Sequence, residues 1–180
     1  NSEINYYNVK VPIEKVKTYL NFLSLVNSKP KIDKIDLSLK EIDVDKLKKI
    51  IIKTKPSSLN SLIVNRVIKG KMQMNLELFF QENLKLENFI LKGSVSKMSG
   101  KFKEKLKFKD TSFNFFADSS DIIIKNVKGS TPGIYIKDGS LQFIKGQDIK
   151  INSEFTSEIN LAGNDLNEYL PMLKNLNFIN

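Results

Sequence analysis

The chain of 180 residues is 41% hydrophobic and 27% charged, which is the composition of an ordered domain rather than of a disordered tail. The absence of Cys and His excludes disulfides and thiolate metal sites, and it removes the usual general base near neutral pH. The net charge of +9 comes almost entirely from lysine that alternates with apolar residues, a distribution that suits an anionic membrane surface better than nucleic acid.

Residues 1–70 are predicted to combine strands with short helices. We expect strands over residues 3–11 and 35–44, and helices over residues 12–29, 45–53 and 57–70. The longest helix is predicted from apolar residues at three- and four-residue spacing, namely Ile13, Val16, Leu20 and Leu23. The expected boundary signals are Pro12, Pro30, Asp45, Pro56, Ser57 or Ser58, and Gly70.

Residues 71–162 show a different pattern, in which apolar and polar residues alternate with a period of two. This alternation predicts strands with one apolar face. It slips by one residue at Glu87-Asn88, Lys125-Asn126 and Lys137-Asp138, and the segment LKFKDTSFNF (106–115) is of the same kind. A slip would turn every later side chain to the opposite face unless a β-bulge absorbs the extra residue. We therefore predict a meander of long, bulged antiparallel strands joined by short turns.

The end of the chain predicts one very long strand and a helix. The strand over residues 149–161 would span about 40 Å at ~3.3 Å per residue. Residues 163–176 predict a short helix capped by Asn164 or Asp165, within a C-terminal region 163–180 that begins a further unit. No run of about 18 or more apolar residues occurs. Because the first residue is not Met and the N-terminal residues already resemble a strand, we expect the chain to be a fragment of a larger protein.

The apolar face of the predicted sheet needs a cover. The sequence leaves three alternatives: a second sheet in a closed sandwich or barrel, the chain's own helices, or lipid acyl chains, which suit a surface of Met, Phe, Leu and Ile. In the last case the face is an open hydrophobic groove. Its predicted lining is Met72, Met74, Leu76, Leu78, Phe80, Phe89, Leu91, Val95, Leu106, Phe108, Phe113, Phe115, Ile122, Ile124, Ile134, Ile136, Leu141, Phe143, Ile149, Ile151, Phe155, Ile159 and Leu161.

The long bulged strands, followed by the segment INLAGNDLNEYLPML (159–173), resemble the AsmA-like superfamily of bacterial envelope proteins over residues 32–176. The resemblance is to the very large members regarded as bridge-like lipid transporters and, more distantly, to the translocation and assembly module subunit TamB. It implies a repeating β-groove, a curved and twisted sheet whose concave face carries phospholipid between the inner and outer membranes. It also implies a periplasmic parent protein anchored in the inner membrane, although this chain lacks the family's N-terminal anchor.

The function predicted on these grounds is a non-catalytic segment of an envelope lipid-transfer protein, with phospholipid as its partner and no cofactor or metal. The glycines of GSVSKMSGKF (93–102) lack the spacing of a phosphate-binding loop, and the acidic residues between Asp33 and Asp45 lack the Gly and terminal Glu of a calcium loop. The main alternative is a structural or adhesive β-domain whose apolar face is closed by its own helices. A hydrolase that uses Lys or carboxylates is a third class, for which no site signature is present.

Overall fold

The computed structural model describes residues 3–6, 8–26, 31–53, 58–102, 106–146 and 149–173. Its strands are β1 (Glu3–Tyr6), β2 (Val9–Leu20), β3 (Ile32–Leu39), β4 (Ile42–Asp43), β5 (Val67–Phe80), β6 (Leu86–Lys101), β7 (Lys107–Ala117), β8 (Asp121–Thr131), β9 (Ile134–Lys145) and β10 (Ile149–Ile159). Its helices are α1 (Phe22–Val26), α2 (Val44–Ile51), α3 (Ser58–Arg66) and α4 (Gly163–Leu173). Strands hold most of the described residues and helices far fewer, so the predicted mainly β fold is confirmed.

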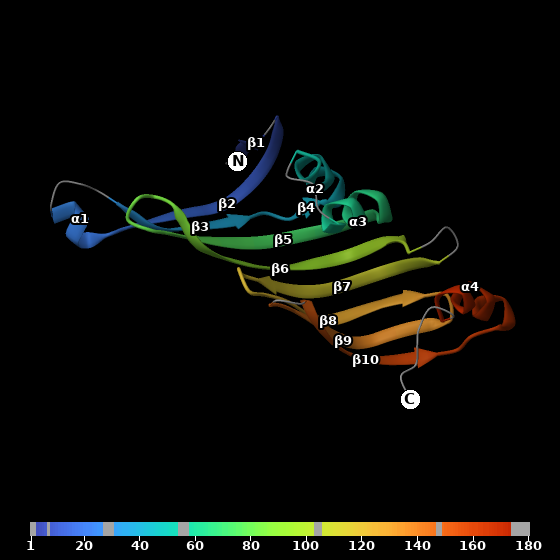
Figure 1. Cartoon of the computed structure of the whole chain (residues 1–180). Coiled ribbons are helices and arrows are strands. Elements are labelled where there is room, and N and C mark those ends of the chain that lie inside the picture. The colour runs from blue at the N-terminus through green and yellow to red at the C-terminus, as the bar shows by residue number, and fades with distance from the viewer. Residues whose placement is uncertain are drawn as a thin grey trace.

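The strands form one curved antiparallel sheet that does not close into a barrel (Figure 1). Their order is β1-β2-β3-β5-β6-β7-β8-β9-β10, and the short β4 also pairs with β5. From β5 to β10 each strand lies beside its neighbour in the chain, which confirms the predicted meander. The described sheet therefore has two edges, β1 and β10.

The predicted bulges are present. The pairing of β5 with β6 skips Glu87, the pairing of β7 with β8 leaves one extra residue at Asn126, and the pairing of β9 with β10 skips Lys137. Two further bulges lie at Asp110 in β7 and Lys97 in β6. Asp110, Asn126 and Lys97 have positive φ angles of 47°, 55° and 51°, the left-handed conformation that Asn and Asp tolerate best among residues with a Cβ.

The predicted helix over residues 12–29 is wrong, because strand β2 continues to Leu20 and, among the described residues of the segment, only the five of α1 are helical. β2 contains a bulge of the same kind, since its pairing with β3 skips Glu14. The bulge places Ile13 and Val16 on the same face although they are three residues apart in the sequence. A bulged strand thus produced a spacing that is typical of a helix.

Several predicted boundaries are also displaced. Helix α3 ends at Arg66 and β5 begins at once, so Gly70 lies inside a strand rather than stopping a helix. The N-cap of α2 is Asp43 rather than Asp45, and β10 ends before Leu161. Helix α4 begins at Gly163, so the predicted caps Asn164 and Asp165 lie in its first turn. Pro30, Pro56, Ser57 and residues 174–176 lie outside the described residues.

The buried core is small for a chain of this length. Among the described residues, the buried hydrophobic side chains are Val11, Ile13, Leu39, Ile42, Val44, Val67, Leu106, Phe108 and Val127. The accessible surface is 13093 Å², roughly half as much again as the about 8,900 Å² expected for a folded monomer of 20.6 kDa. A single curved layer explains this excess, because no second sheet packs against it within the described part of the chain.

We predict that the bulge at Asn126 depends on the left-handed backbone of that residue. Asn126→Val should lower the free energy of unfolding by about 1–2 kcal/mol, because a β-branched side chain is strained in this conformation, whereas Asn126→Gly should leave stability unchanged or raise it. Urea denaturation followed by circular dichroism measures both. Lys128→Val, at an exposed position of the same strand, is the matched control and should unfold like the wild type. Wild-type stability of Asn126→Val would contradict the prediction.

Candidate functional site

The strongest candidate for a functional site is the apolar face of the sheet, defined here as the face that carries Leu76. Directly opposed residues of an antiparallel pair lie on the same face. Following the pairs from Leu76 in both directions gives an unbroken apolar row across eight strands: Val16, Leu37, Leu76, Leu91, Ala117, Ile122, Phe143 and Ile151. Seven inter-strand steps make this row about 34 Å long.

Further rows lie beside the central one on the apolar face. One runs through Met74, Gly93, Phe115, Ile124 and Leu141, and another through Ile42, Met72, Val95 and Phe113. On the other side of the central row lie Ile35, Leu78 and Phe89. The bulges maintain this arrangement, because in each bulged strand the apolar residues after the bulge lie on the same face as those before it.

The cross-strand register places nearly all the predicted lining residues on this one face. The exceptions are Leu106, which precedes β7, Leu161, which follows β10, and Ile149, whose side chain lies outside the described ones. The sequence reading missed Val16 and Leu37, which extend the central row into β2 and β3. The slip at Glu14 was the signal that could have identified Val16.

Helices α2 and α3 cover one end of the apolar face. Ile50 of α2 packs against a cluster of Val11, Ile13 and Leu39. Leu47 of α2 and Ile63 of α3 pack against a second cluster of Val44, Val67 and Phe108. The cover is local: Phe108 is 8% exposed beneath it, whereas Phe155 on β10 is 44% exposed.

Glycines allow aromatic rings to lie flat on the apolar face. Phe155 pairs with Gly139, and a Cβ built on Gly139 would meet the Phe155 ring at 2.2 Å. A Cβ on Gly93 would meet the Phe115 ring at 2.8 Å and the carbonyl oxygen of Gln73 at 2.1 Å. The absence of these side chains keeps the surface smooth between the rows.

Helix α4 is attached to the sheet by a polar contact at the β8–β9 turn. The Tyr169 hydroxyl donates a hydrogen bond to the Pro132 carbonyl at 2.6 Å and lies 2.5 Å from Thr131 Oγ1. Leu161 packs against Gly133 in the same turn, where φ is 70°. This places α4 at the end of the strands where α2 and α3 also lie (Figure 1).

The opposite face of the sheet is mixed in polarity and carries a charge cluster between β3, β5 and β6. Its register also includes the apolar side chains of Phe79, Ile90, Phe116 and Ile123. Asp36 and Glu77 are directly opposed, which would be repulsive without a cation between them. Lys34 Nζ lies 2.9 Å from Asp36 and 2.7 Å from Glu77, and Lys92 Nζ lies 2.9 Å from Glu77. Hydrogen bonds from Lys34 and Lys92 lower the pKa of Glu77, and the hydrogen bond to Glu77 is the main cause of the raised pKa of Lys34.

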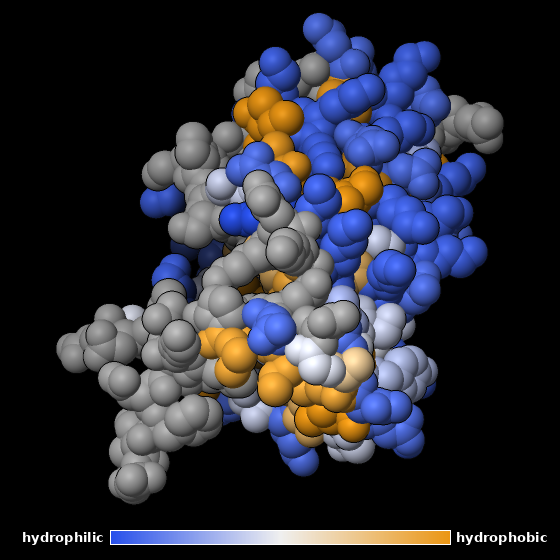
Figure 2. All heavy atoms as spheres, turned by 90° about the vertical axis from the view of Figure 1, so that its right-hand side faces the viewer, coloured by the Kyte–Doolittle hydropathy of each residue, from blue (hydrophilic) through white to orange (hydrophobic). Residues whose placement is uncertain are grey.

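The distribution of polarity can be followed on the molecular surface. Figure 2 looks along the strands from the end that carries the three longer helices. Hydrophilic residues cover one flank and the top of this view, and hydrophobic residues gather at its lower end, level with α4.

Neither a metal site nor a membrane-spanning helix is found in the described part of the chain. No group of three or more Asp and Glu side chains there is placed to hold a metal ion, and none of the described helices is long and apolar enough to cross a bilayer. No family model, no curated protein and no solved structure matches this chain. The apolar face is therefore interpreted on its own geometry.

We predict that Lys34→Met lowers stability at neutral pH, because it leaves the carboxylates of Asp36 and Glu77 facing each other. The lowered pKa of Glu77 means that its ion pairs stabilise the fold above its ordinary pKa of 4.5, and that this contribution is lost as the pH falls through the lowered value. The difference between wild type and variant should therefore shrink in acid. Urea unfolding across the carboxyl titration range measures it.

Lys92→Met is the matched control for this prediction, since it removes one ion pair of Glu77 but leaves Lys34 between the carboxylates. It should have the smaller effect at neutral pH. Equal effects of the two variants, or a difference from wild type that does not change with pH, would contradict the interpretation.

Proposed function

We propose that this chain is a non-catalytic segment of a bacterial envelope protein that shields the acyl chains of phospholipid on its apolar face. The observation that supports the proposal is the unbroken apolar row from Val16 to Ile151, which crosses eight strands. Among the described helices, α2 and α3 cover the apolar face at one end of these strands. The apolar face needs a partner of matching chemistry, because exposed apolar patches of this extent are uncommon on soluble monomers.

The length and the side-chain composition of this face suit hydrocarbon chains. The row of about 34 Å is about twice the hydrocarbon thickness of one leaflet, which is half of the ~30 Å bilayer core. Each methylene removed from water would contribute about 0.8 kcal/mol. Rows of Leu, Ile, Met and Phe without charged side chains offer no specific contacts to a head group, so we expect little discrimination between phospholipid classes.

The mechanism that we propose is passive. Acyl chains would lie along the rows, across the strands, and head groups would remain in water at the ends of the strands. The chain supplies a path and no driving force, and it needs neither a nucleophile nor a cofactor. We base two further parts of the proposal on the resemblance to the AsmA-like superfamily. They are the location of the chain between the inner and outer membranes and its attachment to both through other parts of a longer protein.

A structural or adhesive β-domain closed by its own helices is the competing proposal. The clusters beneath α2 and α3 favour this competing proposal in the region of Phe108, where helices cover the apolar face. It does not account for the half-exposed apolar residues that continue through Ile122 to Ile151 and Phe155.

We expect purified, detergent-free protein to contain phospholipid, detectable by mass spectrometry of an organic extract. The head groups should reflect the bulk lipids of the expression host, because the apolar rows do not distinguish them. Folded protein that yields a clean extract and takes up no labelled phospholipid would overturn the proposal.

The two proposals predict different outcomes for the same substitution at two phenylalanines. Phe155→Glu should stay folded, because the new carboxylate reaches water, and it should lower the binding of labelled phospholipid by about tenfold or more. Phe108→Glu would bury an unpaired carboxylate, at a cost of several kcal/mol against a total stability of about 5–15 kcal/mol, and should not fold. Thermal unfolding and a fluorescent lipid-binding assay measure both. Unfolding of Phe155→Glu would favour a closed domain.

A further inference from the structure

Helix α1, at the connection between β2 and β3, has an inverted distribution of polar and apolar side chains. Its serine, Ser24, is 7% exposed, whereas Phe22 and Leu23 are 75% and 71% exposed. Leu25 and Val26 are also exposed. An amphipathic helix on the surface of a water-soluble protein buries its apolar residues and exposes its polar ones, so α1 is arranged for an apolar surrounding.

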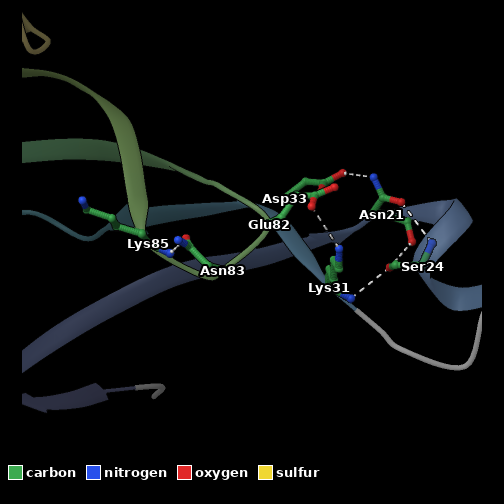
Figure 3. Close-up of polar contacts among 7 residues, drawn as sticks. All are labelled: Asn21, Ser24, Lys31, Asp33, Glu82, Asn83 and Lys85. Carbon is green, nitrogen blue, oxygen red and sulfur yellow. Dashed lines mark hydrogen bonds and ion pairs between the residues drawn. The ribbon is translucent and has the colours of Figure 1, made fainter.

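A polar network holds α1 in this orientation (Figure 3). Asn21 Oδ1 accepts a hydrogen bond from the Ser24 backbone N–H at 3.0 Å, and Asn21 Nδ2 donates one to Asp33 at 3.2 Å. Ser24 Oγ donates to the Asn21 carbonyl at 2.7 Å and accepts from the Lys31 backbone N–H at 2.9 Å. These four hydrogen bonds, with the Lys31–Glu82 ion pair at 3.6 Å beside them, fix the inverted orientation without apolar packing.

The neighbouring β5–β6 turn adds to the exposed apolar surface. Leu84 is exposed at this turn and has a positive φ of 60°, a conformation in which Gly or Asn is usual. A hollow of about 580 Å³ lies between the turn and α1. Leu23 and Phe80 line it together with polar and charged side chains, among them Lys31, Asp33, Glu82 and Glu87. The exposed residues of α1 thus lie at one end of the strands, opposite the end that α2, α3 and α4 occupy (Figure 1).

We propose that α1 and the β5–β6 turn dock this end of the sheet onto a lipid bilayer, with Phe22 and Leu23 inserted among the acyl chains. This inference rests on the proposed function and names the surface from which lipid would reach the apolar face. Docking would bring the strand end at Phe80, where the apolar face begins, next to the bilayer.

A bilayer fits the size and charge of this surface better than a protein does. The four apolar side chains of α1 expose on the order of 500 Å², less than the about 800 Å² that each partner contributes to a stable protein interface. Shallow insertion into a bilayer has no such lower limit on area. The net charge of +9 of the whole chain provides a further attraction to anionic lipid.

The absence of Trp in the sequence allows a direct test with the whole chain. Phe22→Trp places a single tryptophan in α1, and Ile52→Trp places one at an exposed apolar position beyond the end of α2 as a matched control. The probe is a vesicle made of phosphatidylcholine and phosphatidylglycerol in equal amounts, with and without brominated acyl chains. We expect the emission of Phe22→Trp to shift to the blue on vesicle addition and to be quenched by bromine, and that of Ile52→Trp to remain unchanged.

A flotation assay with the same vesicles gives an independent measurement. Phe22→Ser with Leu23→Ser should reduce the bound fraction at least tenfold, and Ile52→Ser with Ile68→Ser, which removes two exposed isoleucines elsewhere, should bind like the wild type. Unchanged flotation of the α1 variant, or emission of Phe22→Trp that bromine does not quench, would overturn the docking proposal, as would a dimer that the α1 variant converts to a monomer.

The outcomes distinguish docking from lipid shielding. Phe22→Ser with Leu23→Ser should still bind labelled phospholipid supplied in detergent micelles, because its apolar face is intact. A wild type that docks on vesicles but holds no phospholipid would overturn the proposed function alone.

Discussion

The β-bulge is the constraint on which the rest of this structure depends. Side chains of a strand alternate between faces, so a single unpaired shift would carry the apolar residues of half a strand to the solvent. At Glu14, Glu87, Asn126 and Lys137 the extra residue is absorbed locally, and the apolar residues on both sides of it share a face. Bulges also bend and twist the strand that contains them, which is consistent with the curvature of the sheet. The continuity of the apolar rows and the curvature of the sheet thus both arise from the bulges.

A sheet that is apolar on one face and has no second layer cannot bury its side chains by itself. The surface area reflects this, since the chain exposes far more than a globular monomer of its mass. Helices α2 and α3 supply a core where Phe108 lies, and the pairing of β3 with β5 joins the meander to the N-terminal strands. Elsewhere the rows remain half-exposed, and an apolar ligand is the cover that we propose for them.

The opposite face of the sheet carries most of the charged side chains of the strands. Lysines at alternate positions project from it, and the cluster of Lys34, Asp36, Glu77 and Lys92 joins three neighbouring strands by ion pairs. Lys34 also lies 5.3 Å from the ring centroids of Tyr19 and Phe79, so its charge is held over two aromatic faces. The apolar face and the opposite face are therefore separated by the same period of two that forms the strands.

Much of the sheet was predictable because alternation is a local property. The strands from β5 to β10, the bulges at Glu87, Asn126 and Lys137, and the side chains that share the apolar face all follow from the residue pattern, since a period of two and a slip can be read without knowledge of neighbours. The same reasoning failed at residues 12–29, where a bulge at Glu14 converted a strand into helical spacing. Only the pairing with β3 shows that this segment is a strand.

The cover of the apolar face could be learned only from the tertiary structure, because burial depends on elements that are distant in the sequence. Nothing local indicates that α2 packs over Phe108 while Phe155 stays half-exposed, or that Val16 and Ile151 belong to one row across eight strands. The orientation of α1, too, could be learned only from the tertiary structure. Its five residues are apolar apart from Ser24, and only the hydrogen bonds to Asn21 and to the Lys31 backbone turn that serine inward and leave Phe22 and Leu23 in the solvent.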